Sequence, residues 1–95
     1  IPPIYIAKRD TFIINVPFGY VNPVWEIIMK IFGERILQLR KERKLGQEEV
    51  AKAVNISYHS YRRYENNERE PQASVIRDLA DFFDVSTDYL LGKAD

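Results

Sequence analysis

Two short amphipathic segments joined by a break at Asn55 constrain the fold of this chain more than any other feature. Asparagine tolerates the left-handed backbone conformation that a tight turn needs. Ser57, two residues later, is a suitable N-cap for a following helix. We therefore expect one helix over residues 46–54 and another over residues 57–66, separated by a turn of three or four residues.

Residue spacing divides the second of these segments into two faces. Steps of about 100° per residue put Tyr61, Tyr64 and Glu65 on one side, where we expect core and rim contacts. The other side carries hydrogen-bonding and stacking groups, which are His59, Arg62, Arg63 and Asn66. Tyr58 and Ser60 lie at the N-terminal end of this face. An ordinary surface helix would carry mostly Glu and Lys at such positions, so this face is predicted to contact a partner.

Three more short helices are predicted around this pair. Apolar residues at four-three spacing indicate a first helix over residues 32–44. Pro71 opens a fourth helix, and Ser86 caps a fifth that Gly92 stops. The small Ala51 lies where the third helix must approach the second, as in a helix-turn-helix. The expected fold class is therefore all-α, a bundle of five short helices.

Composition excludes several classes of protein. The chain has 95 residues and no cysteine, so it makes one small domain without disulfides or thiolate metal sites. With a single histidine, no metal and no cofactor are expected. The apolar runs are too short for a bilayer and no secretory signal is visible, so we expect a cytoplasmic protein with no membrane partner. No nucleophile and base arrangement or glycine-rich phosphate loop indicates an enzyme.

The formal net charge is zero, but the charges are unevenly distributed. Residues 30–75 carry ten Lys or Arg against seven Asp or Glu, whereas residues 76–95 carry two against five. Local fields rather than totals decide where a polyanion docks. A polyanionic partner is therefore expected on the central part of the chain, with the acidic C-terminal part facing away.

Four motifs occur in order along the chain: R-x-x-R-K in the first predicted helix, "QEEVA", "Y-E-N" before a charged loop and Pro71, and the closing "DVSTDYLLG". Over residues 32–92 they resemble the Cro/phage-repressor (XRE-like) helix-turn-helix family of DNA-binding regulators. The resemblance implies a five-helix, lambda-repressor-like helix-turn-helix bundle. The chain departs from the family at Asn55 and Asn67, where glycine is common, and at Tyr61, where a small aliphatic residue is usual.

The same resemblance implies roles for individual residues in binding double-stranded DNA. It makes Gln47 and Asn66 phosphate contacts and pairs Arg40 with Glu65, the alternative for Arg40 being a direct phosphate contact. The positions that reach base edges in the major groove fall on Tyr58, His59 and Arg63, with Ser60 and Arg62 beside them. Three basic residues at the end of the first helix are expected to line the same DNA face as phosphate contacts: Lys41, Arg43 and Lys44.

Large apolar residues near the C-terminal end predict an assembly. Five of them exceed what a small core is expected to bury and are predicted to form part of a two-fold contact: Phe82, Phe83, Tyr89, Leu90 and Leu91. The leading hypothesis is a homodimeric transcriptional regulator that binds a pseudo-palindromic operator. The alternative is a protein-interaction module, such as an antitoxin or regulator subunit, because Arg, Tyr and His suit either kind of surface.

Residues 1–29 differ from the helix-turn-helix domain expected over residues 30–95. They hold four of the five prolines and show no helical period, so we expect an irregular arm with a short strand at residues 11–16. Two origins stay open. Met29 reads like a natural start for this family, which favours translated upstream or cloning-derived sequence. The rival is an authentic arm that pairs with a second chain or lies across the bundle.

Overall fold

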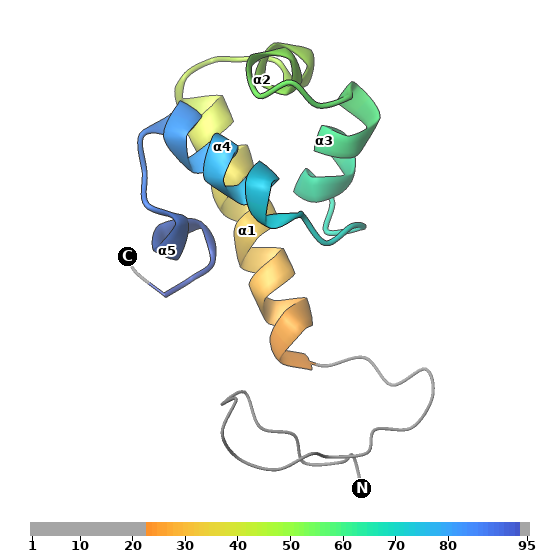
Figure 1. Ribbon diagram of the computed structural model, residues 1–95, viewed down its shortest axis with the longest axis vertical. Helices are drawn as coiled ribbons and strands as arrows, with labels where there is room; N and C mark the ends of the chain where they lie inside the picture. Colours follow the sequence, from red (N-terminus) through yellow and green to blue (C-terminus); the bar gives the residue numbers. More distant parts are fainter. Residues whose placement is uncertain (1–22, 94–95) are drawn as a thin grey trace, which may run out of the picture.

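The computed structural model describes residues 23–93, and these residues form five α-helices and no strand (Figure 1). In chain order the helices are α1 (Pro23–Glu42), α2 (Gln47–Ala53), α3 (Tyr58–Glu65), α4 (Ala73–Phe83) and α5 (Thr87–Leu90). The four shorter helices gather around the C-terminal half of α1, with α2 and α3 on one side and α5 on the other. The all-α, five-helix class expected from the sequence is confirmed.

The start of α1 was predicted wrongly. The helix begins at Pro23, nine residues before the expected start at Phe32, and it ends at Glu42. Proline fits the first position of a helix, because the N–H that it lacks has no partner there in any case. The expected domain boundary between residues 29 and 30 therefore lies inside a continuous helix. The short strand expected at residues 11–16 lies outside the described residues.

The core draws side chains from every helix. Its largest fully buried members are Phe32 and Ile36 from α1, Val50 from α2, Tyr61 from α3, Leu79 and Phe83 from α4, and Leu90 from α5. The rings of Phe32 and Tyr64 meet edge to face, with their centroids 6.4 Å apart. Burying each such side chain contributes about 1.5–3 kcal/mol, so the bundle is held mainly by this one cluster.

The C-terminal end of α3 approaches the backbone of α1 at Gly33. A Cβ atom at this position would lie 2.8 Å from the carbonyl oxygen of Tyr64 and 2.9 Å from that of Glu65. Backbone atoms cannot move aside as a flexible side chain can, so glycine is required here. This contact fixes where α3 ends relative to α1.

Every helix is followed by a residue in the left-handed conformation. The left-handed residue after α5 is Gly92, with φ 85°. The other four are not glycine and have φ between 56° and 62°: Lys44, Asn55, Asn67 and Asp84. The break predicted at Asn55 is confirmed. The predicted N-caps are also confirmed, because Ser57 Oγ accepts a hydrogen bond from the Ser60 N–H at 3.0 Å and Ser86 Oγ accepts one from the Tyr89 N–H at 2.9 Å.

Two of the five residues expected in a dimer contact are wrongly assigned. Phe83 is 1% exposed and Leu90 is 0% exposed, so both belong to the core of a single chain. The core is larger than the sequence suggested, since α4 and α5 fold back onto α1. Phe82, Tyr89 and Leu91 are half-buried beside this core and keep some exposed surface.

Candidate nucleic-acid interface

The two faces predicted for α3 are both present in the structure. Tyr61, Tyr64 and Glu65 are 0%, 4% and 8% exposed and point into the bundle. The four residues predicted for the outward face are all exposed: His59, Arg62, Arg63 and Asn66. Tyr58, at the start of the helix, is exposed as well. The rings of Tyr58 and His59 lie 5.5 Å apart between centroids and are tilted by 59°. The outward face therefore combines two aromatic rings with two guanidinium groups.

A buried ion pair holds α3 against α1. Arg40 Nε donates to Glu65 Oε2 at 2.7 Å, and Arg40 NH2 donates to Glu65 Oε1 at 3.1 Å. The two side chains are only 13% and 3% exposed. Arg40 NH1 donates to the carbonyl oxygen of Leu45 at 2.9 Å, so all three nitrogens are used within the chain. The expected pairing with Glu65 is present, and this geometry leaves no role for Arg40 as a direct phosphate contact.

Gln47 extends this pair to α2. Its Nε2 atom donates to Glu65 Oε1 at 2.8 Å. The Glu65 carboxylate, at the end of α3, is therefore bonded both to Arg40 near the end of α1 and to Gln47 at the start of α2. Burial opposes ionisation of Glu65, but Arg40 above all, and then the nearby Tyr61 hydroxyl and Gln47, outweigh it and hold the pKa of the carboxyl below its ordinary value of 4.5. The network is therefore charged at neutral pH and fixes the orientation of α3 relative to α1 and α2.

Tyr61 lies in the same buried cluster but contributes differently. Its hydroxyl is buried beside the Arg40–Glu65 pair, and within residues 23–93 it makes no hydrogen bond of normal geometry. Burial raises the pKa of Tyr61 well above that of an exposed phenol, so the group stays neutral. The ring fills the space between α3 and α1, where the family resemblance implied a smaller aliphatic residue.

Ser60 is placed at the edge of the outward face rather than within it. Its Oγ atom accepts a hydrogen bond from Ser57 Oγ at 3.0 Å and another from Arg69 NH1 at 3.3 Å. The expected role of Ser60 beside the base-reading residues stays a prediction. Arg69 was missed by the sequence analysis, because it lies in a loop without periodicity and nothing in its neighbours places it against α3.

The residues expected to contact phosphate fall in different settings. Lys41, Lys44 and Asn66 are exposed, whereas Gln47 is half-buried and uses one of its two amide N–H groups on Glu65. Arg43 donates from NH1 to the carbonyl oxygen of Phe82 at 3.1 Å and from NH2 to that of Phe83 at 2.7 Å.

The phosphate contact expected of Arg43 stays a prediction, because the side chain is exposed and these bonds use only two of its five N–H donors. Its guanidinium also lies 5.5 Å from the centre of the Phe83 ring. A cation at the C-terminal end of a helix is stabilised by the helix dipole and by the last carbonyl groups, and Arg43 occupies that position on α4. Arg43 thus joins the end of α1 to the end of α4 and keeps exposed surface.

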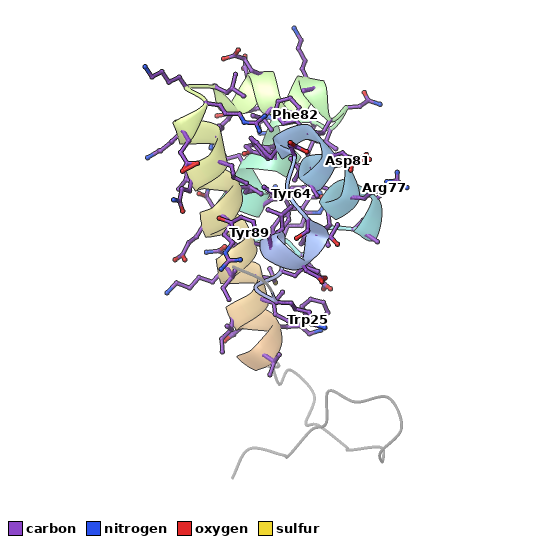
Figure 2. All side chains as sticks on the ribbon, turned by 90° about the vertical axis from the view of Figure 1, so that its left-hand side faces the viewer. Trp25, Tyr64, Arg77, Asp81, Phe82 and Tyr89 are labelled. Carbon is purple, nitrogen blue, oxygen red and sulfur yellow. The ribbon has the colours of Figure 1, made fainter. Side chains whose placement is uncertain are left out.

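An apolar cavity of about 150 Å³ lies beside the N-terminal half of α1, lined among others by Trp25, Ile28, Ile76 and Leu91. Figure 2 shows Trp25 on this part of the helix, away from Phe82 at the other end of the molecule.

Among the described residues there is no group of three His, Cys, Asp or Glu side chains that could hold a metal ion. None of the helices found in residues 23–93 is long and apolar enough to cross a membrane.

The fold and the arrangement of α2 and α3 define a helix-turn-helix protein, and sequence comparison identifies the family. A family model described as a helix-turn-helix domain matches residues 33–95. The chain belongs to this family, among the Cro and C1-like proteins, as the four sequence motifs predicted.

Individual relatives match over the same region. The uncharacterized HTH-type transcriptional regulator YobD of Bacillus subtilis (strain 168) is 38% identical over 65 residues, covering 68% of this chain and 58% of YobD. The HTH-type transcriptional regulator ImmR of the same organism is 36% identical over 61 residues, covering 64% of this chain and 48% of ImmR. The chain thus spans about half the length of these curated relatives.

A solved structure supports the same assignment. The P22 c2 repressor protein, crystallised in complex with a synthetic operator, is 33% identical and superposes with a TM-score of 0.63. The match covers 66% of this chain and 96% of the repressor chain. The similarity therefore extends over nearly the whole of the smaller, DNA-bound structure.

Proposed function

We propose that this chain is a sequence-specific DNA-binding domain of a cytoplasmic, non-enzymatic transcriptional regulator. One observation carries the proposal. The exposed row of α3 is held by a buried Arg40–Glu65 pair, so its aromatic and guanidinium groups are presented on a rigid support. The 33% identity with the P22 c2 repressor, whose structure contains a synthetic operator, supports the choice of DNA as the partner.

In this proposal α3 enters the major groove. The planar fork of Arg63 can donate two hydrogen bonds to O6 and N7 of a guanine, which is the commonest specific contact in that groove. Tyr58 and His59 offer further donors and an apolar ring edge one turn earlier, with Arg62 beside them. Base contacts of this kind supply sequence preference, and phosphate contacts fix the register.

The proposed phosphate contacts lie at the ends of three helices. Gln47 retains one amide N–H that its bond with Glu65 does not use, and Asn66 is exposed at the C-terminal end of α3. Lys41 and Lys44 are exposed at the end of α1 and in the turn that follows. Each phosphate that such a group neutralises releases counterions from the duplex, so binding must weaken as salt rises.

The regulator is proposed to act as a homodimer on a pseudo-palindromic operator. Phe82, Tyr89 and Leu91 are the remaining candidates for the two-fold contact, because they keep exposed surface at the end of α4 and around α5. An isologous contact would place two α3 helices one helical turn of DNA apart, at about 34–36 Å. Sedimentation that shows a monomer at micromolar concentration, with and without duplex, would refute the dimer.

The decisive test compares two substitutions on duplexes selected from a random pool by the chain itself. Arg63→Ala should cost roughly 1–3 kcal/mol on the selected duplex and relax preference at one base pair per half-site. Gln47→Ala should weaken binding to all sequences alike, because it removes a phosphate contact and one hydrogen bond to Glu65 but no base contact. If Arg63→Ala weakens all single-base variants of the duplex equally, the reading role passes to Tyr58 and His59.

Salt dependence separates the proposed function from the alternative of a protein-interaction module. A DNA-binding face requires a linear fall of log affinity with log salt, with a slope of about −0.9 per phosphate contact. If the chain binds no duplex, or if its affinity for duplex does not change with salt concentration, it is not a DNA-binding domain. A stoichiometric protein complex that DNA leaves unchanged would then favour the alternative.

A further inference from the structure

We infer that Arg69, in the loop between α3 and α4, is an additional phosphate contact, and that Ser60 is the residue that positions it. The inference rests on the function proposed above and extends it to a loop residue that neither the α3 periodicity nor the family motifs single out. It follows from how the chain turns after α3, from one hydrogen bond back to that helix, and from the charges around the loop.

The chain reverses direction immediately after α3. Asn67 has φ 62°, and its N–H donates to the carbonyl oxygen of Tyr64 at 3.3 Å. The N–H of Glu68 donates to the carbonyl oxygen of Arg63 at 2.9 Å. These two bonds, with Asn67 itself in the left-handed conformation, close the end of α3 and direct the following residues back along it.

The reversed loop is anchored on α1. The Asn67 side chain lies so close to Gly33 that its Oδ1 atom is the nearest atom that a Cβ at Gly33 would meet. The carbonyl groups of Tyr64 and Glu65 flank the same glycine. The base of the loop is therefore seated between α1 and α3, and Arg69 begins from a fixed position only two residues further on.

The Arg69 side chain then reaches the N-terminal half of α3. Its NH1 atom donates to Ser60 Oγ at 3.3 Å. Ser60 is itself held, because Ser57 Oγ donates to Ser60 Oγ at 3.0 Å and accepts from the Ser60 N–H at 3.0 Å. At about 100° per residue, Ser60 lies only about 60° around the helix from Arg63. The Arg69 cation thus borders the outward face on the side of Arg63.

The charge of Arg69 is left available for a polyanion. The ion pairs within residues 23–93 are Arg40–Glu65 and Arg77–Asp78, so Arg69 is not neutralised by a carboxylate there. A guanidinium has five N–H donors, and the bond to Ser60 occupies one. The neighbouring Glu68 and Glu70 are exposed and would oppose DNA if the loop were free. The bond to Ser60 gives the loop a positive side toward α3.

The test measures salt-dependent binding of the full chain to a fluorescent duplex selected from a random pool, and to a random-sequence duplex of equal length. Arg69→Ala should lower the salt slope by about 0.9 on both duplexes, which is roughly an eightfold loss of affinity at 0.1 M salt. Arg69→Lys keeps the cation and should restore the slope. Ser60→Ala keeps the charge but frees it, so the slope should persist while affinity falls less than in Arg69→Ala.

Arg77→Ala is the matched control. Arg77 is an exposed arginine on α4 that pairs with Asp78, and its loss should change neither slope nor affinity. A wild-type slope in Arg69→Ala, or an equal loss in Arg77→Ala, overturns the inference while leaving the proposed function intact. If the unmodified chain shows no salt-dependent binding to either duplex, the proposed function itself has failed.

Discussion

The hydroxyl group of Tyr61 is buried in the core beside Glu65 and makes no hydrogen bond of normal geometry within residues 23–93. A buried hydroxyl without a partner costs about 1–3 kcal/mol, because folding removes it from water and returns no hydrogen bond. Tyr61→Phe keeps the ring and deletes this atom. We therefore expect the free energy of unfolding, measured by urea denaturation, to stay equal or to rise by about 1–2 kcal/mol.

Tyr61→Ala is the comparison that separates ring from hydroxyl. It leaves a cavity between α3 and α1 and should lower the free energy of unfolding by about 3–5 kcal/mol. A loss of more than about 1 kcal/mol in Tyr61→Phe would show instead that the hydroxyl contributes a favourable hydrogen bond in solution.

Glu65 gives stability a defined dependence on pH. Its pKa in the folded chain lies below the ordinary 4.5, so its contribution is fully present above about pH 4.5 and is lost as pH falls through the folded value. Urea midpoints between about pH 7 and pH 3 should therefore fall more steeply for the native chain than for Glu65→Gln. Glu48→Gln, an exposed change on α2, should leave the native slope unaltered. Parallel curves for all three proteins would contradict the depressed pKa.

At the residue scale, the sequence predicted which side chains are buried or exposed better than it predicted which side chains bond to one another. The exposed and buried sides of α3 follow from the helical period, so His59 and Tyr61 could be assigned correctly from spacing alone. Arg43 and Arg69 could not, because their partners come from other elements. Arg43 bonds to carbonyl groups 39 and 40 residues away, and Arg69 bonds across a reversed loop. No local pattern encodes either contact.

At the scale of elements, the close approach of α1 and α3 depends on Gly33. Gly33→Ala places a methyl group within 2.8 to 2.9 Å of two backbone oxygens, which must shift to accept it. We expect a loss of about 1–3 kcal/mol in the free energy of unfolding, because a tightly packed contact tolerates added volume poorly. Thermal or urea denaturation provides the measurement.

Gly46→Ala is the control for this prediction. A Cβ at Gly46 would meet only the Glu49 side chain, at 3.4 Å, which is close to an ordinary contact. Its effect should therefore be much smaller than that of Gly33→Ala. Equal losses in the two variants would mean that general loss of glycine, rather than the approach of α3 to α1, sets the cost.

The elements themselves were predicted unevenly, for a physical reason. The end of α2 depends on the left-handed Asn55 and the start of α3 on the Ser57 cap, which are local signals that a sequence displays directly. The first turns of α1 carry prolines nearby and β-branched residues that favour strands. Ile28 and Met29 are half-buried beside α4 and α5, and such tertiary contacts override local propensity.

At the scale of the whole molecule, the core does not require the segment before Met29. Within residues 23–93, the buried hydrophobic residues all lie at Phe32 or beyond. A chain that begins at Met29 should therefore stay folded, melt cooperatively and bind duplex DNA with the same salt slope. It should lose some stability, because Trp25 and Ile28 line the apolar cavity beside α4 and α5.

Circular dichroism melting and duplex titration of this shortened chain provide the measurement. Loss of a cooperative transition would show that the early turns of α1 are structural and that Met29 is not a sufficient start. A shortened chain that melts normally but binds DNA more weakly would instead place part of the DNA contact before residue 29.

The left-handed turn after α1 sets two properties of the molecule against each other. Asn and Asp visit this conformation readily, whereas a lysine such as Lys44 is held there at a cost of about 1–2 kcal/mol. Glycine would relieve that strain but would lose about 0.5–1 kcal/mol through the greater freedom of its unfolded chain. Lys44→Gly should thus raise heat tolerance slightly and remove one positive charge from the turn before α2. A gain in stability at this residue would therefore come with the loss of one of the proposed phosphate contacts.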